Sequence, residues 1–131
     1  LGRGDLPLAA ARRLLGDGKL LGYSVNRPEH LAHALAAGAD YVGTGPVFAT
    51  GTKQNTAPEI GLDGIRELAA QANGFPRVAI GGISLATASA VIEAGASGIC
   101  VIAAILGAAD IGQAARNLRQ AVEHGRRQRQ G

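Results

Sequence analysis

The sequence has very little of the material from which several classes of protein are built. Its 131 residues include one cysteine, no methionine or tryptophan, and only two tyrosines and two phenylalanines. A single cysteine, Cys100, cannot form a disulfide within the chain, which favours a reducing cytoplasm over a secreted disulfide scaffold. No signal peptide opens the sequence, and the longest nearly apolar run, residues 99–109, is too short to span a bilayer.

A basic face for nucleic acid is also lacking, although the formal net charge is +3. Residues 1–115 hold eight Lys/Arg and nine Asp/Glu, a net charge of −1, whereas residues 116–131 hold five Arg and one Glu, a net charge of +4. The excess therefore belongs to a C-terminal helix end and tail, which we expect to be solvated. Without aromatics interleaved among the basic residues, nucleic-acid binding is not predicted.

What the chain has in quantity is a repeated alternation of short apolar strands and helices. Strands are predicted at residues 19–24, 41–42, 77–80 and 98–102, with residues 1–6 as a strand end and loop. Helices are predicted from Pro7 to about residue 15 and over residues 26–37, 62–72, 84–95 and 110 onward, with Asn26, Ser84 and Asp110 as N-caps. This order indicates an α/β fold with a parallel sheet.

A short internal repeat supports repeated βα units. Residues 36–42 and 93–99 share the pattern of a helix end, Gly, Ala, a polar residue and a strand. Such units build either a (β/α)₈ barrel or a doubly wound sheet. No Gly-x-Gly-x-x-Gly opens a helix, so a dinucleotide-binding sheet is disfavoured.

Residues 40–53 form a candidate anion-binding segment. A short strand turns at Gly45-Pro46 and leads into a loop with Thr50, Gly51, Thr52 and Lys53. Glycine allows a ligand to approach the backbone closely, and the ammonium group supplies charge. A turn with a solvated lysine would have the same sequence, so this segment alone does not decide between the two.

The loops that follow the last two predicted strands strengthen the hypothesis of a phosphate site. Residues 78–80 run into Gly81-Gly82, and about 20 residues later the strand around Cys100 ends near Ile102. In barrels of this type, the loops after the last two strands often bind phosphate through backbone N–H groups. Two buried strands with glycine turns are the simpler alternative.

Together these motifs resemble the thiamine-phosphate synthase family, a branch of the thiamine monophosphate synthase/TenI superfamily. The resemblance is carried by Gly-Arg-Gly-Asp-Leu-Pro at residues 2–7, Gly-Tyr-Ser at 22–24, residues 43–53, Val-Ala-Ile-Gly-Gly-Ile at 78–83 and the last strand at 98–105. It implies a (β/α)₈ TIM barrel and a transferase that joins hydroxymethylpyrimidine diphosphate to thiazole phosphate, with Mg²⁺, releasing pyrophosphate.

The resemblance also implies roles for individual residues. Asp5 matches one of two magnesium-binding aspartates, although it could equally cap the helix that follows. Ser24 matches a serine near the pyrimidine diphosphate, and Lys53 matches a lysine that contacts the diphosphate. The residues matching the thiazole phosphate site are Thr50, Gly51, Thr52, Gly82, Ile102 and Ala103. The implied partners are these small molecules, with neither nucleic acid nor membrane.

Several positions depart from the family pattern. The family often has Gln-Glu where this chain has Arg3-Gly4, and usually serine at Ala103. Asn26 stands where relatives often have histidine; in the related thiazole tautomerases that histidine is catalytic, so Asn26 argues against a tautomerase. His30 and His33 lie one helical turn apart with no third ligand in view, so we expect surface residues rather than a metal pair.

Length is the largest departure. A TIM barrel takes about 200 residues or more, so this chain corresponds to the C-terminal half, with about the last four to five βα units and a basic tail at 116–131. By resemblance, the other half carries the second magnesium aspartate and the remaining diphosphate-binding side chains. We therefore expect weak or absent activity from the isolated chain, with uncovered strand faces that favour a homo-oligomer. Among enzymes, a thiazole tautomerase of the TenI type is the alternative, and a phosphate-binding remnant without catalysis is the alternative from another class.

Overall fold

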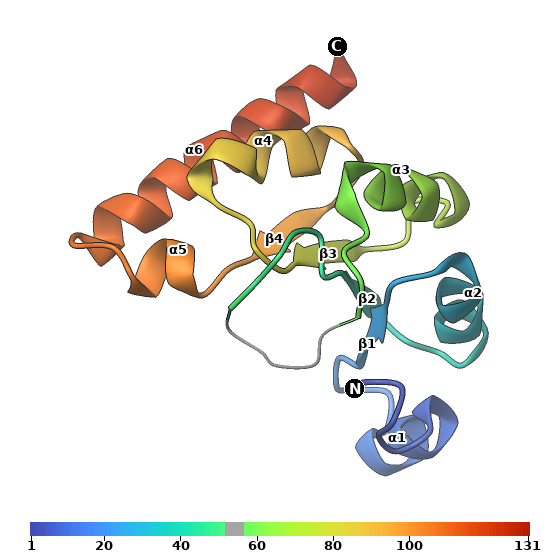
Figure 1. Ribbon diagram of the computed structural model, residues 1–131. Helices are drawn as coiled ribbons and strands as arrows, with labels where there is room; N and C mark the ends of the chain where they lie inside the picture. The colour runs from blue at the N-terminus through green and yellow to red at the C-terminus, as the bar shows by residue number, and fades with distance from the viewer. Residues whose placement is uncertain (52–56) are drawn as a thin grey trace.

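The chain alternates strands and helices as the sequence predicts (Figure 1). The computed structural model describes residues 1–51 and 57–131. In chain order the elements are α1 (Leu8–Leu15), β1 (Gly22–Val25), α2 (Pro28–Ala36), β2 (Tyr41–Thr44), α3 (Gly61–Gln71), β3 (Arg77–Ile80), α4 (Leu85–Glu93), β4 (Gly98–Cys100), α5 (Ala103–Leu106) and α6 (Ile111–Gln130). None of the helices within these residues is long and apolar enough to cross a membrane.

The four strands form one parallel sheet in the order β1-β2-β3-β4. Sequential order and parallel pairing mean that each connecting helix returns the chain to the same edge before the next strand begins. The carboxyl ends of all four strands therefore lie along one edge. Leu1 extends the sheet beside β1, because its N–H group donates to Gly22 O at 2.8 Å and its carbonyl accepts from Ser24 N at 2.9 Å.

Helices cover one face of the sheet only (Figure 1). Side chains on that face, such as Val25, Val42 and Ala79, are almost completely buried, because α2, α3 and α4 pack over them. On the opposite face Tyr41 and Ile80 are 38% and 45% exposed. We call this second side the open sheet face.

The two predicted glycine turns are confirmed and have matching hydrogen bonds. Gly38 and Gly95 both have positive φ, after α2 and α4. Asp40 Oδ2 then accepts from Leu21 N at 2.6 Å, and Ser97 Oγ accepts from Arg77 N at 3.1 Å. In both repeats the polar residue before a strand thus ties that strand to the start of its neighbour.

Two of the three predicted N-caps are confirmed. Ser84 forms a capping box with Thr87, and Asp110 Oδ1 accepts from Gln113 N at 2.8 Å. The cap at Asn26 is wrong: Arg27 holds the N-cap position of α2 and its side chain makes no capping bond. Proline at the first helical position removes one N–H group that would need a cap, so the helix starts without one.

The expectation of a solvated basic tail is also wrong in part. Residues 116–130 belong to the long helix α6, which packs along α4. Arg126 donates to Ser97 O at 2.9 Å, and Arg129 donates to Ile92 O and Ala96 O at 3.2 and 2.9 Å. Of these carbonyl groups, that of Ile92 lies in the last turn of α4, where a helix carries partial negative charge, and those of Ala96 and Ser97 lie in the turn that follows.

Candidate functional site

A cavity of about 680 Å³ opens where the four strands end. Residues that follow or end β1, β2, β3 and β4 line it, including Asn26, Gly45, Gly82 and Ile102. This is the position that the sequence predicts for ligand binding in a βα-repeat sheet. The cavity size lies within the range of small-molecule sites.

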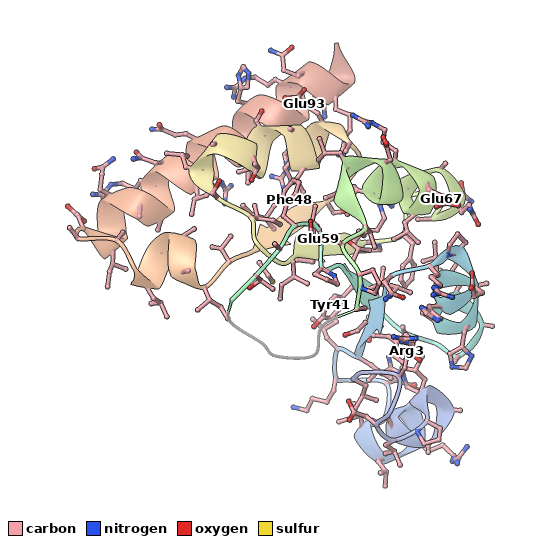
Figure 2. All side chains as sticks on the ribbon, viewed as in Figure 1. Arg3, Tyr41, Phe48, Glu59, Glu67 and Glu93 are labelled. Atoms are coloured by element: carbon pink, nitrogen blue, oxygen red, sulfur yellow. The ribbon has the colours of Figure 1, made fainter. Side chains whose placement is uncertain are left out.

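Glycine makes one wall of the cavity possible. Gly82 has a φ of 62°, a conformation that side chains disfavour, and a Cβ atom there would lie 2.3 Å from Ala49 O. At Gly45, a Cβ atom would lie 2.1 Å from Ile80 O. The chain after β2 is thereby packed directly on the end of β3, and Phe48 N donates to Gly81 O at 3.0 Å. Figure 2 shows Phe48 in this central position.

The opposite wall is built by the end of β4 and the short helix α5. The predicted strand to Ile102 is too long, since β4 ends at Cys100. Helix α5, which the sequence analysis missed, begins at Ala103 directly after Ile102. The N–H groups of Ala103 and Ala104 lie in its first turn, where a helix has no carbonyl acceptor of its own. Both residues line the cavity, so these N–H groups suit an anionic ligand.

Most of the predicted binding residues that the structure describes gather at this cavity. Ser24, Thr50, Gly82, Ile102 and Ala103 all line it. Gly51 is exposed and follows Thr50 directly. Thr52 and Lys53, for which the sequence predicts phosphate and diphosphate contacts, lie outside the described residues.

Asp5, the predicted magnesium ligand, lies in the loop between Leu1 and α1. Its Oδ2 atom accepts from the backbone N–H of Gly2 at 2.6 Å, and its own N–H donates to Gly2 O at 3.2 Å. The alternative role as an N-cap is wrong, because Pro7 precedes the first turn of α1 and no side chain caps that helix. Asp5 thus closes a tight turn around Arg3.

Arg3 is a cavity residue that sequence reasoning treated only as a departure from a family pattern. It lines the cavity together with Gly2 and Asn26, and Figure 2 shows it beside β1 and α2. Among the described residues that line the cavity, Arg3 alone carries a charged side chain. Its position between two glycines, two residues before Asp5, was the available signal.

The two histidines of α2 have different surroundings. His33 is exposed and its ring meets that of Tyr23 edge-on at 5.7 Å. His30, expected on the surface, is half-buried: its Nε2 atom lies 3.5 Å from an Arg3 guanidinium nitrogen. Burial lowers the pKa of His30, and the Arg3 charge lowers it further. Within the described residues, His30 Nδ1 and Asn26 Oδ1 are buried without hydrogen-bond partners.

Comparison with known proteins shows which family this chain resembles. A family model described as thiamine monophosphate synthase matches residues 1–105. The chain is 46% identical over 126 residues to a thiamine-phosphate synthase of Moorella thermoacetica and 48% identical over 122 residues to one of Chloroflexus aurantiacus. These alignments cover 96% and 93% of this chain but 60% and 56% of the relatives.

A solved structure shows the same fold. The thiamine phosphate pyrophosphorylase from Pyrococcus furiosus superposes with a TM-score of 0.85 at 38% sequence identity, covering 95% of this chain and 58% of that one. The chain therefore spans less than two thirds of the length of these relatives. The predicted α/β fold class is confirmed by the four-stranded parallel sheet and by this likeness.

Proposed function

The chain belongs to the thiamine monophosphate synthase family, and from this premise we propose that it forms the C-terminal half of a thiamine-phosphate synthase barrel. The reaction would couple hydroxymethylpyrimidine diphosphate with thiazole phosphate to give thiamine phosphate and pyrophosphate. The observation that carries the proposal is the cavity of about 680 Å³ at the carboxyl ends of β1–β4. Five of the residues that the family resemblance assigns to substrate binding line it: Ser24, Thr50, Gly82, Ile102 and Ala103.

The thiazole phosphate subsite of this proposal lies at the β3 and β4 ends of the cavity. Gly82 brings backbone close to the ligand, and the first-turn N–H groups at Ala103 and Ala104 point to a site for phosphate oxygens. The family usually has serine where this chain has Ala103. Alanine lacks the serine hydroxyl, but its backbone N–H group is still available to the phosphate. Thr50 and Gly51, with Thr52, complete the proposed subsite from the loop after β2.

The pyrimidine diphosphate would lie on the β1 side, near Ser24, with Lys53 as a cation for the leaving group. In this reaction the bond between the methylene carbon and the diphosphate oxygen breaks, and its electron pair stays on that oxygen. The lone pair of the thiazole nitrogen then forms the new carbon–nitrogen bond. The step needs no protein nucleophile, so positioning and electrostatic stabilisation of the leaving group are the work left to the protein.

Magnesium stays a prediction of the resemblance. Mg²⁺ requires octahedral oxygen coordination and usually takes one or two carboxylates together with substrate phosphates. Among the described residues no group of three His, Cys, Asp or Glu could hold a metal ion. Asp5 Oδ2 already accepts a bond from Gly2 N. The described residues therefore do not form a magnesium site by themselves, and the proposal draws no step from one.

A chimera tests the function directly. The 126-residue segment of the Moorella thermoacetica relative that aligns with this chain would be replaced by the chain itself. Given both substrates and Mg²⁺, the chimera should release pyrophosphate and form thiamine phosphate. A folded chimera without turnover, beside an active Moorella parent, would contradict the synthase proposal and favour a phosphate-binding remnant. The isolated chain should be inactive and bind thiazole phosphate weakly.

A further inference from the structure

The charge distribution around the cavity leads to one residue beyond those assigned by resemblance. In the proposed reaction the larger negative charge arrives with the diphosphate, and an anion in a cavity requires donors or cations. The described walls supply backbone N–H groups, hydroxyls and a single charged side chain, that of Arg3. A guanidinium offers five N–H donors in a planar fork that fits phosphate oxygens.

The loop holds Arg3 at the correct end of the cavity. Before Arg3, Leu1 is hydrogen-bonded to β1 through Gly22 O. After Arg3, the Asp5 carboxylate accepts a hydrogen bond from Gly2 N and so holds the turn that contains Arg3. Ser24, the residue proposed for the pyrimidine diphosphate, is the last but one residue of the same strand, lines the cavity and carries no charge. Arg3 therefore lies on the β1 side, across the cavity from the proposed thiazole phosphate subsite at Gly82 and Ala103.

His30 directs the guanidinium without competing for the anion. Arginine has donors only, so at 3.5 Å the His30 Nε2 atom must be the acceptor and the ring proton must reside on Nδ1. The Nδ1 atom is buried, which leaves Nε2 as the ring nitrogen that faces Arg3. One N–H group of Arg3 is used in this contact, at the long end of hydrogen-bond distance, and the guanidinium keeps its other donors.

We propose that Arg3, positioned by His30, binds the diphosphate group of the substrate. This inference rests on the proposed function and extends it by a contact at a position where the family often has an uncharged glutamine. When the carbon–oxygen bond breaks, the electron pair that stays on the diphosphate oxygen is stabilised by the guanidinium, and no atom of Arg3 enters a covalent step. His30 is a positioning residue in this arrangement.

Calorimetric titration of the 131-residue chain with inorganic pyrophosphate, at 150 mM salt and neutral pH, tests the contact. Arg3→Gln should weaken binding about tenfold, the scale of one charge-assisted hydrogen bond at a partly solvated position. Arg3→Lys should recover only part of the loss, because a point charge lacks the fork. The matched control is Arg27→Gln, which removes an exposed charge at the start of α2 outside the cavity wall.

Two substitutions distinguish a positioning role of His30 from simple packing. His30→Gln keeps a side-chain acceptor and should bind pyrophosphate within about twofold of the parent chain. His30→Phe keeps the ring volume but loses the acceptor and should bind about threefold more weakly, an order-of-magnitude expectation for one weak neutral hydrogen bond. Equal affinities for the two variants would limit His30 to packing and overturn its positioning role. Circular dichroism confirms that each variant is folded.

Two results would overturn the Arg3 contact: no measurable binding of pyrophosphate by the parent chain at millimolar concentration, or equal weakening by Arg3→Gln and Arg27→Gln. The second result would indicate only diffuse charge attraction. The synthase proposal is tested separately, by the chimera. Arg3-dependent pyrophosphate binding, together with a chimera that makes no thiamine phosphate, would retain the anion contact and remove the assigned reaction.

Discussion

Replacing Gly82 by alanine should destabilise the chain and disturb the phosphate-binding wall at once. Gly82 has a φ of 62°, and its missing Cβ atom would lie 2.3 Å from Ala49 O and 3.0 Å from the Phe48 carbonyl carbon. The nearest obstacle is backbone, which cannot move aside as a flexible side chain would. The substitution must therefore strain residue 82 and push the chain after β2 away from β3.

The size of the effect follows from two contributions. A non-glycine residue in the left-handed region costs about 1–2 kcal/mol, and overpacking against a fixed neighbour costs about 1–3 kcal/mol. Together they give a loss of about 3 kcal/mol in the free energy of unfolding, or about 10 °C in Tm for a chain of this length. That is a large fraction of the stability of an ordinary domain.

Thermal and urea unfolding of Gly82→Ala measure this loss, and Gly98→Ala is the matched control. A Cβ atom at Gly98 would meet nothing within 4 Å, so the control should change Tm by no more than about 2 °C. Because the displaced segment leads directly to Thr50, the variant should also bind thiazole phosphate more weakly than the control does. Equal Tm values for the two variants would refute the packing argument at Gly82.

Three further predictions concern charge, pH and association. In an active chimera, Lys53→Ala should slow the chemical step by about two to three orders of magnitude with unchanged Tm. Near-normal turnover would contradict a role for Lys53 in stabilising the leaving diphosphate. The side-chain hydrogen bond from Arg12 holds the pKa of Asp40 below its ordinary 3.8, and a bond from Leu21 N lowers it further. This carboxylate therefore stabilises the fold at neutral pH, and its contribution begins to fall near about pH 4 and is lost as the pH drops through the lowered pKa of the folded state. Urea unfolding from pH 7 to pH 3 should therefore show a weaker pH dependence for Asp40→Asn than for the parent chain, and parallel curves would contradict this linkage. The open sheet face should drive self-association of the isolated chain, which sedimentation measures; a monodisperse monomer with synthase activity would show that the half-barrel interpretation is wrong.

Local signals predicted the order of the elements well, because each depends on near neighbours in the chain. Ser84 and Asp110 cap their helices as the spacing indicates, and Gly38 and Gly95 end α2 and α4 with positive φ. The Asn26 cap failed although its spacing was equally good. Proline at position 28 allowed the helix to begin one residue later, so two local signals competed and the stronger backbone constraint prevailed.

The tail and the cavity could not be read in the same way. Five arginines near one end of a chain look solvated in sequence, but Arg126 and Arg129 donate to carbonyl groups in the last turn of α4 and in the turn after it, 29 to 37 residues away. Helix α5 was missed because four residues give too short a period to recognise. Arg3 was noted as a departure, and only its place on the cavity wall indicates a use for its charge.

By itself the sequence determined the strand–helix alternation, the family resemblance and the glycine positions that let backbone approach a ligand, because these depend on local conformational preferences and on short motifs. Only the tertiary structure decided which of the candidate residues share a cavity, that the one charged side chain described on its wall is Arg3, and that His30 is its neighbour. Parallel pairing brings together neighbouring strand ends that are 19 to 36 residues apart in the chain, and the depth and electrostatics of the resulting site depend on that packing.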